Sequence, residues 1–276
     1  EGGDNWVDGA IAGSGGTARP IIISRILGGD PMGATQLNHG RQAEELIEAG
    51  MMLDLTDVAE AGGWADIVNP SSLLNSCTLD GRIYCVPVNI HSAQWLWLSH
   101  DAYEKAGLDV PADWNEFVAS APALEAAGMV PLAMVQQGWQ QNLAFGAITI
   151  AVAGLDAWRD VTVNKNADTA RGPEYAAVFE AVANARELAR ESNVQDWNQA
   201  TNMVITGQAG AQLMGDWAQG EFSVAGQVEG QDYSCLPGLG LNAILDTGGD
   251  AFYFPANDDP EITAAQKELA ALLISP

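Results

Sequence analysis

The sequence has 276 residues, of which 47% are hydrophobic and 17% are charged, as is typical of a folded chain rather than a disordered one. Eleven Lys and Arg stand against 36 Asp and Glu, which gives a formal net charge of −25. Such a field repels phosphate backbones and anionic lipid, so we expect no binding to nucleic acid or to a membrane surface. No apolar run approaches the roughly 20 residues of a membrane-spanning helix, so direct membrane insertion is not expected either.

The first fifty residues alternate between predicted strands and predicted helices. Strands are expected at residues 6–12 and 32–37, and helices at residues 17–27 and 41–49. Glycines follow both helices, as is common at helix ends. The order strand, helix, strand, helix predicts parallel strands joined by right-handed crossovers.

Residues 77–99 have the pattern of a hairpin followed by a tryptophan-rich strand. Asp80-Gly81, between apolar runs, is a typical hairpin turn. Cys77 and Cys85 flank this turn and would face each other across the strands, which predicts a disulfide; two buried free thiols are the alternative. A disulfide would favour an oxidising compartment. Cys235 is left without a predicted partner.

A helix is expected to begin at Trp114. Asp113 and Glu116 have the spacing of a capping box, with Asp in place of Ser or Thr. Trp114 and Phe117 open a stripe of apolar residues at helical spacing, and Gly128 ends it. We therefore expect Trp114 to lie in the core.

The rest of the chain continues the alternation of helices and strands. A last helix is expected after Asp259 and Pro260, which are typical of the N-cap and first helical positions. Further helices are expected at residues 143–153, 174–190, 197–206 and 217–225, and strands at residues 95–98, 130–135, 212–214, 233–237 and 251–255.

A series of short motifs runs in a fixed order through the chain. They are Asp80-Gly81-Arg82 with Tyr84 and Pro87, the strand around Trp97, Lys105-Ala106-Gly107, Pro111, Asp113-Trp114-Asn115-Glu116-Phe117 and Pro131-Leu132. Each piece is short, but the ordered set resembles extracellular solute-binding protein family 1, specifically the sugar-binding receptors of bacterial ABC importers. The resemblance covers essentially the whole chain.

The resemblance implies an α/β fold of two lobes, the type II periplasmic-binding-protein fold. We expect residues 1–98 and 247–276 to form lobe 1, and residues 99–246 to form a helix-rich lobe 2. By the same resemblance the chain is truncated: the fold is expected to be incomplete at both ends and to lack the family's signal peptide.

Ligands of two-lobed α/β receptors bind where strands end at the cleft between the lobes. Gln36 and His39 follow a predicted strand at a place where the family carries sugar-binding residues; a helix start with an exposed histidine is the alternative. His91 lies in the polar segment 89–94 and is either a sugar ligand or a hydrogen-bonded structural histidine.

Two more places offer aromatic faces or carboxylates for a sugar. Trp139, in a Gln/Gly loop, either stacks on sugar or packs the loop onto the core. Residues 207–217 resemble the family motif whose tryptophan stacks on sugar, which assigns that role to Trp217, with Asp216 beside it to pair hydroxyls. Asp250 supplies a second carboxylate just ahead of a strand, where family members place a ligand-binding residue.

These features predict the substrate-binding component of an ABC sugar importer. It would bind a small sugar, with a monosaccharide such as glucose as the expected ligand, and deliver it to the permease by hinge closure. We expect a periplasmic monomer that is not an enzyme and needs no cofactor; no Cys/His cluster has metal-binding spacing.

Two alternative functions, each of a different class, stay open. A secreted carbohydrate-active enzyme of glycosidase type would use Asp216 and Asp250 as its acid and nucleophile. Against it, the sequence has no G-x-S-x-G, H-E-x-x-H or P-loop motif. The other reading is an interaction protein that has lost transport. Release of reducing sugar would indicate the enzyme, and retention of unmodified sugar the receptor.

Overall fold

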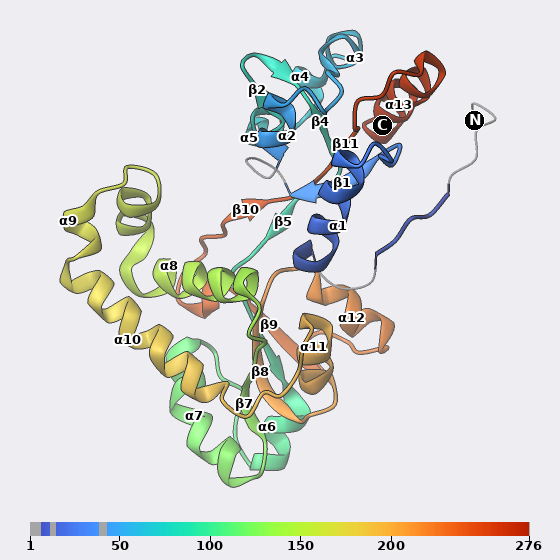
Figure 1. Ribbon diagram of the computed structural model, residues 1–276. Helices are drawn as coiled ribbons and strands as arrows, with labels where there is room; N and C mark the ends of the chain where they lie inside the picture. The colour runs from blue at the N-terminus through green and yellow to red at the C-terminus, as the bar shows by residue number, and fades with distance from the viewer. Residues whose placement is uncertain (1–6, 12–14, 39–42, 276) are drawn as a thin grey trace. The chain divides into compact units, whose positions relative to one another are not determined.

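The computed structural model describes residues 7–11, 15–38 and 43–275 (Figure 1). The chain forms two compact units of mixed helix and strand. Unit 1 contains the chain up to His91 and from Gly248 onwards, and unit 2 contains Ser92–Thr247. No helix among the described residues has both the length and the apolar composition to cross a membrane.

The boundaries of the units differ from the predicted lobes by a few residues. The prediction placed residues 92–98 in lobe 1, but strand β6 (Trp95–Ser99) lies between two strands of the unit 2 sheet. Its backbone hydrogen bonds therefore assign it to unit 2. The chain passes from unit 1 to unit 2 in β5 (His91–Ser92) and returns to unit 1 in β10 (Thr247–Gly248), and these two strands pair with each other.

Unit 1 is built on a three-stranded antiparallel sheet. Its order is β1 (Thr35–Asn38), β11 (Asp250–Tyr253) and β4 (Cys85–Pro87). The expected parallel neighbour of β1 is not there, because residues 7–11 form no strand; Trp6 and Ala12 lie outside the described residues. Strand β11, which comes after the chain has returned to unit 1, pairs with β1 instead. This pairing is antiparallel, so the predicted parallel pairing was wrong.

Helices cover both faces of the unit 1 sheet. Along β11, Ala251 and Tyr253 pack with Ile22 and Ile26, whereas Phe252 and Phe254 pack with the cluster around Trp64. This alternation is the period of two expected of a strand that is buried on both faces. The helices are α1 (Gly15–Leu27), α2 (Glu44–Glu48), α3 (Thr56–Ala61), α4 (Trp64–Ile67), α5 (Ser71–Ser76) and α13 (Pro260–Leu273).

The predicted hairpin is present in unit 1 and has a two-residue turn. Strands β2 (Thr78–Leu79) and β3 (Arg82–Ile83) pair across Asp80-Gly81. Asp80 has φ 51° and Gly81 φ 77°, the positive values that a type I′ turn requires at both central positions.

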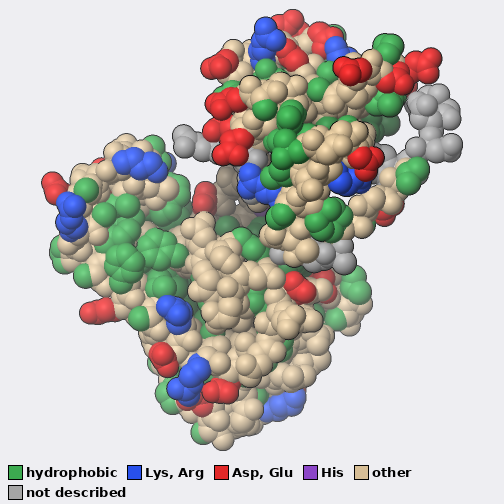
Figure 2. Space-filling model, in the orientation of Figure 1, with side chains coloured by type: hydrophobic (Ala, Val, Ile, Leu, Met, Phe, Trp, Pro, Cys, Tyr) green, Lys and Arg blue, Asp and Glu red, His purple; other side chains and the backbone are tan. Residues whose placement is uncertain are grey.

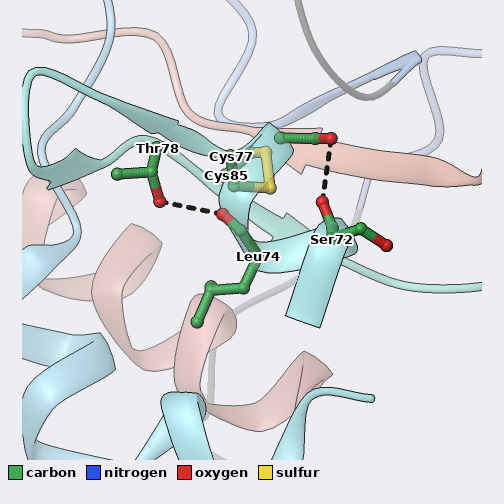
Figure 3. Close-up of a disulfide and its surroundings, with 6 residues drawn as sticks. Ser72, Leu74, Cys77, Thr78 and Cys85 are labelled. Atoms are coloured by element: carbon green, nitrogen blue, oxygen red, sulfur yellow. Dashed lines mark hydrogen bonds between the residues drawn. A yellow bond between two sulfur atoms is a disulfide. The ribbon is translucent and has the colours of Figure 1, made fainter. Parts of the chain in front are cut away.

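The predicted disulfide between Cys77 and Cys85 is confirmed. The two Cα atoms are 5.0 Å apart and both side chains are buried (Figure 3). Thr78 Oγ1 donates to the carbonyl of Leu74 at 2.8 Å, which ties the hairpin to the end of α5. Cys235 remains a free cysteine; burial and the adjacent Glu229 carboxylate raise its pKa to about 12.

Unit 2 is built on a four-stranded mixed sheet. Its order is β7 (Val130–Ala133), β8 (Ala209–Met214), β6 and β9 (Tyr233–Pro237), with only the β7–β8 pair parallel among these strands. The helices around it are α6 (His100–Ala106), α7 (Trp114–Ala126), α8 (Gly138–Thr162), α9 (Ala167–Ala170), α10 (Pro173–Leu188), α11 (Trp197–Ile205) and α12 (Ala218–Val224).

The helices that the sequence predicts in unit 2 are all present, with one exception in length; α6 and α9 were not predicted. Asp113 Oδ1 accepts from the N–H groups of Asn115 and Glu116, while Glu116 reaches back to the N–H of Ala112 at 2.8 Å. Trp114 is 4% exposed, as expected of a core residue. The exception is α8, which is much longer than residues 143–153 and is interrupted at Gly154, where φ is 84°.

The surface reflects the composition of the chain. Acidic and basic side chains are both spread over the visible face (Figure 2), although Asp and Glu outnumber Lys and Arg by 36 to 11 in the whole chain. Apolar side chains also gather over α8 and α10 of unit 2, where Phe179 is 57% exposed and contacts Phe145 with ring centroids 5.7 Å apart.

Replacing Cys77 and Cys85 together by Ser should lower the free energy of unfolding by about 2–3 kcal/mol, because the cross-link no longer restricts the unfolded chain. Urea denaturation followed by circular dichroism measures the change. Cys235→Ser is the control and should stay within about 0.5 kcal/mol of the wild type. An unchanged double variant would show that the bond does not stabilise unit 1.

Candidate functional site

In unit 1, polar side chains converge on the carboxylate of Asp250. Gln36 Nε2 donates to Asp250 Oδ1 at 2.5 Å, and Asn89 Nδ2 donates to Oδ2 at 3.0 Å. His91 Nε2 lies 2.7 Å from Oδ2. We call these four residues the Asp250 cluster.

The strand pairing explains how the Asp250 cluster forms. Asp250 begins β11 opposite Asn38 of β1, and Gln36 lies two residues away on the same exposed side of β1. Gln36 is therefore the diagonal neighbour of Asp250, within reach of a long side chain. The backbone N–H of Asp250 donates to Asn89 Oδ1 at 2.7 Å, so Asn89 is held at both ends of its amide.

The cluster keeps the Asp250 carboxylate charged. Burial raises the pKa of Asp250, but the hydrogen bonds from the three side chains and the positive field of His91 outweigh burial and leave the pKa below its ordinary value. A carboxyl group with a lowered pKa is ionised at neutral pH and is a poor general acid.

In unit 2, Asp216 binds Ser92, which lies just before strand β6. Its Oδ2 accepts from the N–H of Ser92 at 2.8 Å and from the Ser92 hydroxyl at 2.7 Å, and its own N–H donates to the Ser92 carbonyl. Trp95 Nε1 donates to the same hydroxyl at 2.8 Å. Asp216 therefore has a structural role in addition to the predicted contact with sugar hydroxyls.

Two tryptophans lie together in unit 2, at the ends of neighbouring parallel strands. Trp139 follows β7 at the start of α8, and Trp217 follows β8. Parallel strands end at the same edge of a sheet, which brings the two rings together. Their centroids are 6.3 Å apart with planes inclined by 49°, and both rings are half-buried against the core. We call Trp139 and Trp217 the tryptophan pair.

Gly215 determines where the ring of Trp217 lies. A Cβ atom at residue 215 would come within 2.2 Å of the six-membered ring of Trp217. The indole therefore rests directly on the Gly215 backbone, and any larger residue would displace it. The motif therefore needs a glycine at position 215, because a side chain there would clash with the ring of Trp217.

The structure brings together two sets of predicted site residues. Gln36, His91 and Asp250 meet in unit 1, and Trp139, Asp216 and Trp217 lie near one another at one end of unit 2. His39 lies outside the described residues.

Asn89 and Ser92 were not predicted as site residues, although both lie in the polar segment 89–94. Asn89 joins the Asp250 cluster and Ser92 binds Asp216. In the described parts of the chain, no group of three or more His, Cys, Asp or Glu side chains is placed to hold a metal ion.

The family of the chain follows from comparison with known proteins. The family model described as bacterial extracellular solute-binding protein matches residues 9–275, and the chain belongs to this family. A probable sugar-binding periplasmic protein of Brucella melitensis is 32% identical over 99% of this chain and 65% of its own length. A protein of the same description from Rhizobium meliloti is 31% identical, over 99% and 66%. The chain thus spans about 65% of the length of these relatives.

More distant comparisons agree on the fold. A xylose/arabinose-binding protein of Haloferax volcanii is 23% identical over 86% of this chain and 52% of its own length. A solved chitin oligosaccharide binding protein has a TM-score of 0.71 at 21% identity, covering 92% of this chain and 65% of that one. A maltose-bound protein of T. maritima has a TM-score of 0.67 at 19% identity, covering 94% and 66%. The predicted two-lobed α/β fold and the predicted family are confirmed.

Asp250→Asn should change how stability depends on pH. Because the pKa of Asp250 is lower in the folded chain than in the unfolded chain, its stabilisation is present above the unfolded pKa of about 3.9 and is lost as the pH falls through the folded pKa. The difference in unfolding free energy between wild type and variant should therefore shrink from pH 5 to pH 3, as measured by urea denaturation.

A matched control for this experiment is Asp258→Asn, which changes an exposed carboxylate in the loop before α13. Its difference from the wild type should vary less over the same range. A difference for Asp250→Asn that stays constant or grows towards pH 3 would contradict the stabilising role of the Asp250 cluster.

Proposed function

We propose that this chain is the substrate-binding component of an ABC sugar importer. The observation that carries the proposal is the tryptophan pair: two half-buried rings, one resting on Gly215, at the shared end of β7 and β8. Flat aromatic faces suit the C–H surfaces of sugar rings, and ligands of open α/β sheets bind beyond the strand ends. The sugar-binding names of the relatives support the same ligand class.

The polar partners for the sugar come from both units in this proposal. Asp216 lies beside Trp217, and the Asp250 cluster offers amide, imidazole and carboxylate groups. His39 is proposed as a further ligand from its place after β1. A sugar that engages both groups of residues would favour a closed form of the receptor, which the permease would recognise.

The proposed ligand is a small sugar, with a monosaccharide such as glucose as the first candidate. Names of relatives and titles of similar structures include a xylose/arabinose-binding protein, a receptor bound to tagatose and a maltose-bound protein. We propose that the protein works as a periplasmic monomer and does not turn over its sugar.

A thermal-shift panel of D-glucose, D-xylose, L-arabinose, maltose and D-mannitol tests the proposal. At least one sugar should raise the melting temperature, because a ligand that binds only the folded state stabilises it. Calorimetry should then give a saturable affinity for the same sugar, recovered unmodified. The absence of stabilisation by every sugar, or release of glucose from maltose, would overturn the proposed function.

Trp217→Ala should weaken sugar binding by roughly tenfold or more, because a stacked ring contributes about 1–2 kcal/mol beyond generic burial. Trp114→Ala is the matched comparison: it removes a core ring, so it should cost about 3–5 kcal/mol of stability. Titration calorimetry and urea denaturation measure the two effects. An unchanged affinity of Trp217→Ala would show that this ring does not contact the sugar.

A further inference from the structure

Gln137 occupies the N-cap position of α8 but does not cap the helix with its side chain. Its Oε1 accepts a hydrogen bond from Trp139 Nε1 at 2.6 Å. Its Nε2 donates to the carbonyl of Gln195 at 2.8 Å and to Asp196 Oδ1 at 3.1 Å. The amide thus uses its acceptor and its donors at once, which fixes which end is oxygen and which is nitrogen.

The acceptors on the far side of Gln137 belong to a well-ordered helix start. Asp196 is the N-cap of α11 and forms a capping box with Gln199. Gln199 Oε1 accepts from the N–H of Gln195 at 2.9 Å. The indole of Trp139 is therefore connected through Gln137 to the first turn of a second helix.

This connection determines what Trp139 can offer to a ligand. The indole N–H is its one polar group, and Gln137 already accepts from it, so the ring presents its apolar faces. The neighbouring ring of Trp217 rests on the Gly215 backbone. Both ring planes are thus set before a ligand arrives, which reduces the ordering cost of binding.

We propose that Gln137 is a positioning residue for sugar recognition. It holds the indole of Trp139 in the orientation in which its face, beside that of Trp217, receives the C–H face of a sugar ring. Gln137 does not itself contact the sugar. This inference rests on the proposed function. Gln137 affects the affinity for sugar only by orienting the ring of Trp139.

A double-mutant cycle tests this role. Gln137→Met keeps the length of the side chain and removes both polar ends, and Trp139→Phe keeps a ring and removes the N–H. Binding of D-glucose, D-xylose and maltose is measured by calorimetry. Gln137→Met should weaken binding about tenfold when Trp139 is present and less than about twofold in the Trp139→Phe background, because coupled residues are not additive.

A ligand-free measurement accompanies the cycle. The indole N–H signal of Trp139, assigned by its loss in Trp139→Phe, should move and exchange faster with solvent in Gln137→Met. Gln137→Glu keeps an acceptor for the indole N–H but places a second carboxylate beside Asp196. The Trp139 signal of this variant should therefore lie between those of the wild type and of Gln137→Met. Gln141→Met is the matched control on the same helix turn, because Gln141 Nε2 donates to the Val135 carbonyl at 2.9 Å; its affinity should stay within about twofold.

The outcomes separate the two proposals. An unmoved indole signal, or an equal loss of affinity in both backgrounds, overturns the positioning role while sugar binding by the wild type upholds the proposed function. If the wild type binds none of the sugars, the proposed function fails and the positioning role for sugar fails with it, whatever the indole signal shows.

Discussion

Unit 2 depends on strand β6, which is hydrogen-bonded to β8 on one side and to β9 on the other. Leu96 and Leu98 face the cluster that contains Trp114, whereas Trp97 stacks on Phe222 in the other cluster. One strand therefore separates two cores, and its register fixes which residues enter each. At its start, Trp95 donates to the Ser92 hydroxyl that Asp216 also binds, so the central strand and the candidate site share a hydrogen-bond network.

The candidate site holds its carboxylates with hydrogen bonds from backbone, hydroxyl, amide and imidazole groups. With 36 acidic residues and only 11 Lys and Arg, the chain has few cations to offer its half-buried carboxylates. Asp216 is bound by a backbone N–H and a hydroxyl, and Asp250 by two amides and an imidazole. Charge-assisted hydrogen bonds of this kind hold each carboxylate in one orientation. Hydrogen bonds within the chain therefore set the orientation of these polar groups.

Local sequence signals predicted the fold well, and distant pairings limited the prediction. The hairpin at Asp80-Gly81, the disulfide and the cap at Asp113 each depend on residues no more than 8 positions apart, so the sequence contains their patterns. The parallel pairing predicted for the first strands was wrong because β1 pairs with β11, more than 200 residues later. The same difference between local patterns and distant contacts applies to the candidate site. Motif positions led to the prediction of Trp217 and Asp250 as ligand-binding residues, which stays a prediction. The link from Gln137 to Asp196 joins residues 59 apart and has no local pattern.

The central claim is that the two rings of the tryptophan pair in unit 2 bind one sugar. The most direct measurement is an NMR titration with the best sugar of the panel, following the indole N–H signals of Trp139 and Trp217 in the same sample. We expect both signals to move with one dissociation constant and to saturate at one equivalent of sugar. Movement of only one signal, or two different dissociation constants, would contradict the account.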